Sequence, residues 1–69
     1  MIDIGKQITA MRRARDMTQE QLATLIGVSA QTVSKWECGT TMPDILLLPV
    51  LAEIFETSID ALFGIEPKI

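Results

Sequence analysis

The sequence contains no histidine and a single cysteine, Cys38. A disulfide within the chain therefore cannot form, and a structural zinc site would lack its usual ligands. Catalysis by a nucleophile paired with histidine is excluded on the same ground. A glycine-rich phosphate loop is also missing. We therefore expect a protein that is not an enzyme and that uses no metal and no cofactor.

Long hydrophobic runs are missing as well. No stretch approaches the roughly 20 apolar residues that cross a membrane, and the first residues do not resemble a secretory signal. We expect a cytoplasmic protein that does not bind membranes. The chain has 69 residues, of which 48% are hydrophobic and 22% are charged. This size and composition predict one globular domain, residues 1–69, with a core over about 4–64.

The net charge of −3 is unevenly distributed along the chain. Up to Gly39 there are five basic and four acidic residues, whereas from Thr40 onward there are one basic and five acidic residues. A mildly basic first half can still bind nucleic acid, because the position of charge matters more than its sum. The acidic composition therefore does not exclude a DNA partner.

Apolar residues recur at helical spacing in five places, and signals for strands are absent. The first predicted helix runs from Ile4 to about Arg15. Thr18 and Gln21 form a capping box that begins the second helix, and Gly27 is a natural left-handed residue to end it. The pattern predicts an all-α fold of five short helices.

The third predicted helix, 29–37, begins at Ser29, whose side-chain oxygen can cap it, and ends before Gly39. Val33 and Trp36 lie on its inward face. Between the second and third helices, the turn contains Gly27, which can adopt positive φ and so allows a steep crossing. These features predict a helix-turn-helix formed by the second and third helices.

Asp44 is the predicted cap of the next helical segment, which Pro49 interrupts. We therefore expect a kink or a single turn, followed by a helix that restarts near Pro49. Ser58 caps a last short helix that ends at Gly64. The predicted core side chains of this half are Ile45, Leu48, Leu51, Ala52, Phe55, Ile59, Leu62 and Phe63.

The segment from Thr18 to Gly39, TQEQLATLIGVSAQTVSKWECG, resembles the helix-turn-helix of the XRE, or phage Cro/repressor, family. The resemblance extends from about Ile4 to Gly64 and includes the later segment LAEIFETSIDALF. It implies a repressor-like domain that binds double-stranded DNA sequence-specifically and regulates transcription as a repressor. Such a protein acts as a homodimer on a pseudo-palindromic operator, with helix 29–37 in the major groove.

The resemblance also implies roles for individual side chains. Gln31 can pair with adenine through two hydrogen bonds, and Lys35 can donate to guanine. Gln19 lies at the start of a helix, where backbone N–H groups favour a phosphate. The implied base contacts are Ala30, Gln31, Ser34 and Lys35, and the implied phosphate contacts are Gln19, Ser29, Thr40 and Thr41. Arg12 and Glu37 are implied to form a structural ion pair that joins the first and third helices.

An apolar excess on the fourth helix predicts a dimer interface. Leu47, Val50 and Ile54 recur at i, i+3 and i+7, beside the stripe already assigned to the core. The alternative is that the break at Pro49 rotates part of this stripe into the core. The residues of the predicted interface are Leu47, Val50, Ile54, Phe63 and Ile65, together with Ile69.

Two other functions remain open. The acidic, apolar second half would be the working surface of a protein-interaction module, such as an antitoxin whose DNA binding is only autoregulatory. The chain would equally serve as the DNA-binding head of a longer regulator. Selection of binding sites from random DNA separates a regulator from an interaction module.

Overall fold

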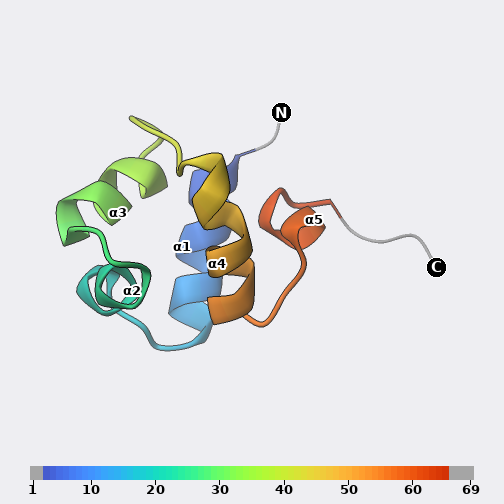
Figure 1. The fold of residues 1–69 in the computed structure, drawn as a ribbon, viewed down its shortest axis with the longest axis horizontal. Helices are drawn as coiled ribbons and strands as arrows, with labels where there is room; N and C mark the ends of the chain where they lie inside the picture. The colour runs from blue at the N-terminus through green and yellow to red at the C-terminus, as the bar shows by residue number, and fades with distance from the viewer. Residues whose placement is uncertain (1–2, 66–69) are drawn as a thin grey trace.

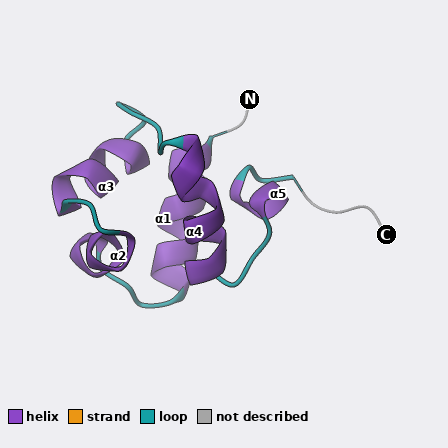
Figure 2. Cartoon of the chain, viewed as in Figure 1, coloured by secondary structure: helices purple, strands orange, loops and turns teal. Residues whose placement is uncertain are grey.

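The computed structural model describes residues 3–65, and its regular structure is entirely helical over that range (Figure 2). The all-α prediction is confirmed. In Figure 1, the fourth helix overlaps the first in the middle of the view. The second and third helices pack against each other on one flank, and the fifth, which packs against the fourth, lies on the other. The elements are α1 (Ile4–Ala14), α2 (Gln19–Ile26), α3 (Ala30–Glu37), the 3-10 turn η1 (Ile45–Leu47), α4 (Leu48–Ile54) and α5 (Ile59–Leu62).

Local caps set the ends of the helices, as predicted. The Thr18 hydroxyl accepts from the Gln21 N–H at 3.0 Å, and the Gln21 side chain accepts from the Thr18 N–H at 2.8 Å. The hydroxyls of Ser29 and Ser58 cap α3 and α5 by accepting from the N–H groups of Thr32 and Ala61. Gly27 ends α2 with a φ of 94°, a conformation that costs glycine little because it has no Cβ.

The predicted interruption at Pro49 is confirmed. Asp44 caps η1, a single 3-10 turn, and α4 begins directly after it. Pro49 is therefore in the first turn of α4, where a backbone N–H would have no helical partner. The proline consequently favours the start of α4 rather than breaking a longer helix.

Every α-helix of the described chain contributes to one core. Each supplies one side chain with 0% exposure, and Trp36 of α3 is only 3% exposed. Trp36 is thus a core residue, as its spacing predicted. The five fully buried side chains are Ile8, Leu22, Val33, Leu51 and Leu62, from α1 to α5 in order.

Two predicted core residues are exposed instead. Ile45 is 76% exposed and Ile59 is 40% exposed. The predicted burial of Ile45 assumes one helical pattern that continues across Pro49. Ile45 instead begins η1, whose main contacts are with α4, directly after it in the chain. Ile59 is the first residue of the one-turn helix α5 and is exposed, whereas Leu62, its last residue, is fully buried.

Gly5 marks a close approach between α1 and the end of α3. Gly5 is buried, and a Cβ built on it would collide with the carbonyl oxygen of Trp36 and lie 3.1 Å from that of Glu37. Both neighbours are backbone atoms, which cannot turn aside as a flexible side chain can. The absence of a side chain at Gly5 therefore allows α1 to contact α3.

We expect Gly5→Ala to destabilise the fold by about 1–3 kcal/mol, because the added methyl group overpacks this contact. Helix propensity alone gives the opposite sign, since alanine is favoured over glycine inside a helix by about 1 kcal/mol. Urea unfolding followed by circular dichroism measures the difference. An equal or higher unfolding free energy in Gly5→Ala would contradict the close approach.

Candidate nucleic-acid interface

Helices α2 and α3 form the predicted helix-turn-helix. The N–H groups of Gly27 and Val28 both donate to the carbonyl of Ala23, at 2.8 and 3.0 Å, and so end α2 in a tight turn. Ala23 itself is only 2% exposed. The turn therefore holds α3 at a fixed angle to α2.

The two faces of α3 differ in chemistry. Val33 and Trp36 are buried, whereas Gln31, Ser34 and Lys35 are exposed. Positions i, i+3 and i+4 share one side of a helix, so these three polar side chains form a single outward stripe. Ala30 is different, because it is half-buried and packs against the core, which leaves only part of its methyl group facing outward.

The predicted ion pair between Arg12 and Glu37 is present in the structure. Arg12 donates through Nε to Glu37 Oε2 at 2.7 Å and through Nη2 to Oε1 at 3.0 Å, in a bidentate arrangement. The side chains are only 11% and 8% exposed. Arg12 Nη1 also donates to the carbonyl of Met17 at 2.7 Å, so one guanidinium group joins α1, the α1–α2 loop and α3.

The pair changes the ionisation of both partners. Burial alone would raise the pKa of Glu37, but hydrogen bonds from Arg12 and Gln19 outweigh it and the pKa falls below its ordinary value. The hydrogen bond to Glu37 raises the pKa of Arg12, against the effect of burial. The structure thus favours the charged form of each group.

Two of the predicted phosphate contacts also have structural partners. Gln19 is half-buried, and its Nε2 donates to Glu37 Oε1 at 3.2 Å, which orients the side chain at the start of α2. Ser29 Oγ accepts from the N–H of Thr32 at 3.1 Å as the cap of α3. Thr40 and Thr41 are exposed just after α3. Sequence reasoning missed the contact between Gln19 and Glu37.

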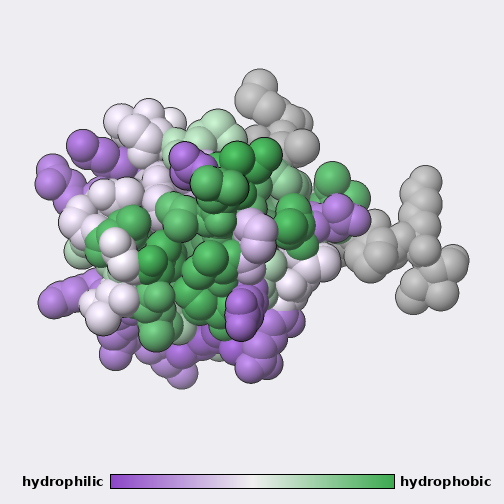
Figure 3. All heavy atoms as spheres, viewed as in Figure 1, coloured by the Kyte–Doolittle hydropathy of each residue, from purple (hydrophilic) through white to green (hydrophobic). Residues whose placement is uncertain are grey.

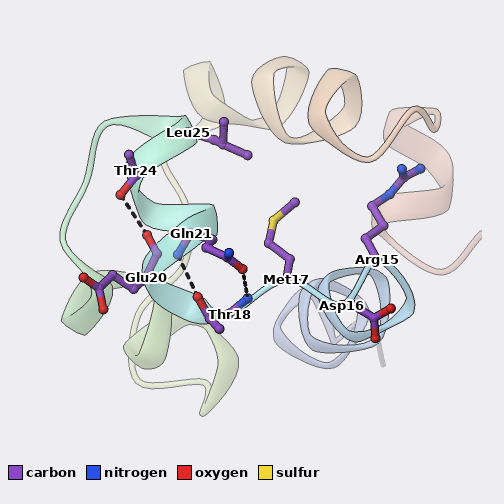
Figure 4. A pocket seen from close by; sticks show the side chains of 8 residues that line it. All are labelled: Arg15, Asp16, Met17, Thr18, Glu20, Gln21, Thr24 and Leu25. Carbon is purple, nitrogen blue, oxygen red and sulfur yellow. Dashed lines mark hydrogen bonds between the residues drawn. The ribbon is translucent and has the colours of Figure 1, made fainter.

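A surface hollow of about 590 Å³ lies along the start of α2 (Figure 4). Its polar groups belong largely to the helix itself: Thr18 and Gln21 form the capping box, and the Thr24 hydroxyl donates to the Glu20 carbonyl at 2.9 Å. Within residues 3–65, no group of three acidic, cysteine or histidine side chains is placed to hold a metal ion. No helix of that range is long and apolar enough to cross a membrane.

A helix-turn-helix family model matches residues 8–62, a span that contains the whole of α2 and α3. The chain belongs to this family, the XRE-type helix-turn-helix proteins. The repressor-like fold and the family resemblance predicted from the sequence are thereby confirmed.

Relatives in this family carry several functional names. The chain is 32% identical over 99% of its length to the HTH-type transcriptional activator BcrR of Enterococcus faecalis. It is 33% identical over 80% of its length to the antitoxin PezA of Streptococcus pneumoniae. The chain spans about a third of each relative, 33% and 35% respectively.

The structure is also similar to that of the P22 c2 repressor, solved in complex with a synthetic operator. The TM-score is 0.83 and the sequence identity is 30%, and the match covers 91% of this chain and 96% of the repressor chain. The two chains therefore share nearly their whole described architecture.

We expect Glu37→Gln to lower the free energy of unfolding at neutral pH by about 3 kcal/mol, since breaking a buried pair leaves Arg12 without its counter-charge. The folded-state pKa of Glu37 is lowered, so the stabilisation is present above the unfolded pKa of about 4.3 and is lost as the pH falls through the folded value. The unfolding free energies of the wild type and Glu37→Gln should therefore become equal in strong acid. Urea unfolding at a series of pH values tests this, with Glu53→Gln, an exposed position of α4, as the control. A difference in unfolding free energy that does not change with pH would contradict the prediction.

Proposed function

We propose that this chain is a sequence-specific double-stranded DNA-binding domain of a transcriptional regulator, with α3 entering the major groove. The observation that carries the proposal is the exposed stripe of Gln31, Ser34 and Lys35, on a helix whose other face is fixed in the core. The P22 c2 repressor, which has the same architecture, was solved on operator DNA and supports this assignment.

The side chains of the stripe match the edges of bases in the major groove. Gln31 can form two hydrogen bonds with adenine N6 and N7, and Lys35 can donate to guanine O6 and N7. Ser34 pairs with either kind of base, and the exposed part of the Ala30 methyl group suits a thymine methyl. The side chains flanking α3 that meet phosphates in this proposal are Gln19, Ser29, Thr40 and Thr41.

A homodimer on a pseudo-palindromic operator follows from the weakness of one half-site. The stripe contains one cation, Lys35, and affinity for DNA rises with the number of phosphates neutralised. Two copies with their recognition helices about 34 Å apart would bind successive major grooves on one side of the duplex. Occupancy of an operator excludes polymerase without further chemistry, so repression is the proposed effect.

The surface around α4 is the proposed dimer interface. Hydrophobic residues gather over the middle of the face in Figure 3, where Figure 1 places α4. Leu47 and Ile54 are half-buried and pack partly against the core, Val50 is also half-buried, and the neighbouring Leu46 is 80% exposed. Of the C-terminal residues, Phe63 is half-buried, Ile65 is 49% exposed, and Ile69 lies outside the described residues.

A protein-interaction module is the second candidate, favoured by the same apolar face and by the likeness to the antitoxin PezA. In that case a different protein would cover α4, and DNA binding would serve autoregulation. Selection of binding sites from a random DNA pool separates the two. A recovered palindrome supports the regulator, whereas no enrichment of any sequence supports the interaction module.

We expect Gln31→Ala to weaken binding to the selected site by about 1–3 kcal/mol and to relax the preference for one base pair. Gln19→Ala is the contrast, because loss of a phosphate contact weakens binding to all sequences alike. Fluorescence anisotropy with the selected duplex and a scrambled duplex measures both variants, after their melting temperatures have been compared with the wild type. An equal loss on both duplexes for Gln31→Ala would contradict base readout by Gln31.

We expect Leu46→Glu and Val50→Glu to convert a dimer into a monomer, since each places a charge in the proposed apolar interface. Sedimentation equilibrium measures the association. Ala10→Glu, on the exposed side of α1, adds the same charge elsewhere and should leave the dimer intact. A monomeric wild type, or a dimer indifferent to both α4 substitutions, would contradict the interface.

A further inference from the structure

The three arginines of the segment RRAR have different roles in the fold. Arg12 forms the ion pair with Glu37, and the Arg15 guanidinium donates to the carbonyl of Phe55 at the end of α4. The guanidinium of Arg13 is exposed and makes no hydrogen bond or ion pair with any residue of the range 3–65. Folding therefore uses two of these cations and leaves the third available for a ligand.

Arg13 lines an open hollow of about 420 Å³ where three helices meet. Lys6, Thr9 and Arg13 follow one another at i, i+3 and i+7 and so form one stripe of α1. The rest of the lining comes from α3 and the start of α2. The remaining lining residues are Gln19 of α2 and Ser34, Glu37 and Cys38 at the end of α3.

The hollow has a local excess of positive charge in a chain with a net charge of −3. Its acidic residue, Glu37, is already neutralised by the bidentate pair with Arg12. Lys6 lies 3.9 Å from Asp3, but the side chains are 83% and 51% exposed, so that pair is weak. Arg13 and Lys6 thus face a polar hollow with little opposing charge.

We propose that this hollow binds a backbone phosphate of the DNA duplex, with Arg13 as its main cation and Lys6 as the second. The inference rests on the proposed function. An arginine fork matches two phosphate oxygens, and the second N–H of the Gln19 amide and the Ser34 hydroxyl are further donors in the lining of the hollow.

The position of the hollow explains how a recognition helix without arginine holds a duplex. Ser34 belongs to both the outward stripe of α3 and the wall of the hollow, so a duplex whose bases face Gln31 and Lys35 brings its backbone to Arg13. Gln19 and Glu37, which are joined by a hydrogen bond, also line the hollow. Helix α1 therefore supplies the charge that α3 lacks.

The salt dependence of DNA binding tests the inference. Each phosphate contact contributes about −0.9 to the slope of log K against log salt concentration. We expect Arg13→Gln to make that slope less negative by about 0.9 per protomer and to weaken binding about tenfold at low salt, equally on the selected and scrambled duplexes. Lys6→Gln should act in the same direction. Arg15→Gln removes the same charge from the residue that follows α1, outside the lining of the hollow, and should leave the slope unchanged.

Cys38 provides a second test in the unaltered sequence, because it is the sole cysteine, is exposed and lines the hollow. A hydrogen bond with Thr40 lowers the pKa of its thiol, which favours alkylation. Iodoacetate leaves a negative group on the sulfur, whereas iodoacetamide leaves a neutral group of similar size. We expect the carboxymethylated protein to bind DNA more weakly than the carbamidomethylated protein. The difference in affinity should decrease as the salt concentration increases.

The outcomes separate this inference from the proposed function. A wild type that selects and binds its site, together with an unchanged slope in Arg13→Gln and equal binding by the two alkylated forms, would overturn the phosphate site and leave the regulator in place. A wild type that binds no duplex would overturn the proposed function and the phosphate site together. A changed slope in Arg15→Gln as large as that in Arg13→Gln would also overturn the site, because the effect would then not belong to the hollow.

Discussion

The ion pair between Arg12 and Glu37 is the interaction on which the candidate interface depends. It fixes the end of α3 against α1, while the same guanidinium holds the α1–α2 loop through the Met17 carbonyl and the same carboxylate orients Gln19. The cost of desolvating two charges is offset only when the geometry is good and other hydrogen bonds complete the site. Both conditions are met here, so the ion pair holds α3 in the position that exposes its outward stripe.

The distribution of charge reconciles an acidic chain with a DNA partner. Within residues 3–65, Arg13 and Lys35 form no ion pair and Lys6 forms only a weak one with Asp3, and all three belong to α1 or α3. Of the acidic residues in the second half, Glu53 lies on α4, Glu56 follows that helix, Asp60 lies on α5 and Asp44 caps η1. Because the field near the surface matters more than the sum of charges, a net negative charge does not exclude the proposed DNA partner.

Features governed by neighbouring residues were predictable from the sequence. The capping box at Thr18 and the turn at Gly27 depend on residues within four positions. The ion pair between Arg12 and Glu37 joins residues 25 positions apart, and it was the family resemblance that predicted it. Gly5, the contact of Gln19 and the exposure of Ile45 depend on how helices meet in space, which no local pattern encodes. Partial burial of Leu47 and Ile54 has the same origin.

The central claim is that one polar side of the domain, formed by α3, the start of α2 and the facing stripe of α1, is the surface that meets DNA. Titration of the isotope-labelled chain with its selected duplex, followed by amide chemical shifts, tests this most directly. We expect the largest shifts at Arg13, Gln19 and Gln31, with smaller changes on α4 from dimer formation. Shifts confined to α4 and α5, with α3 unaffected, would contradict it.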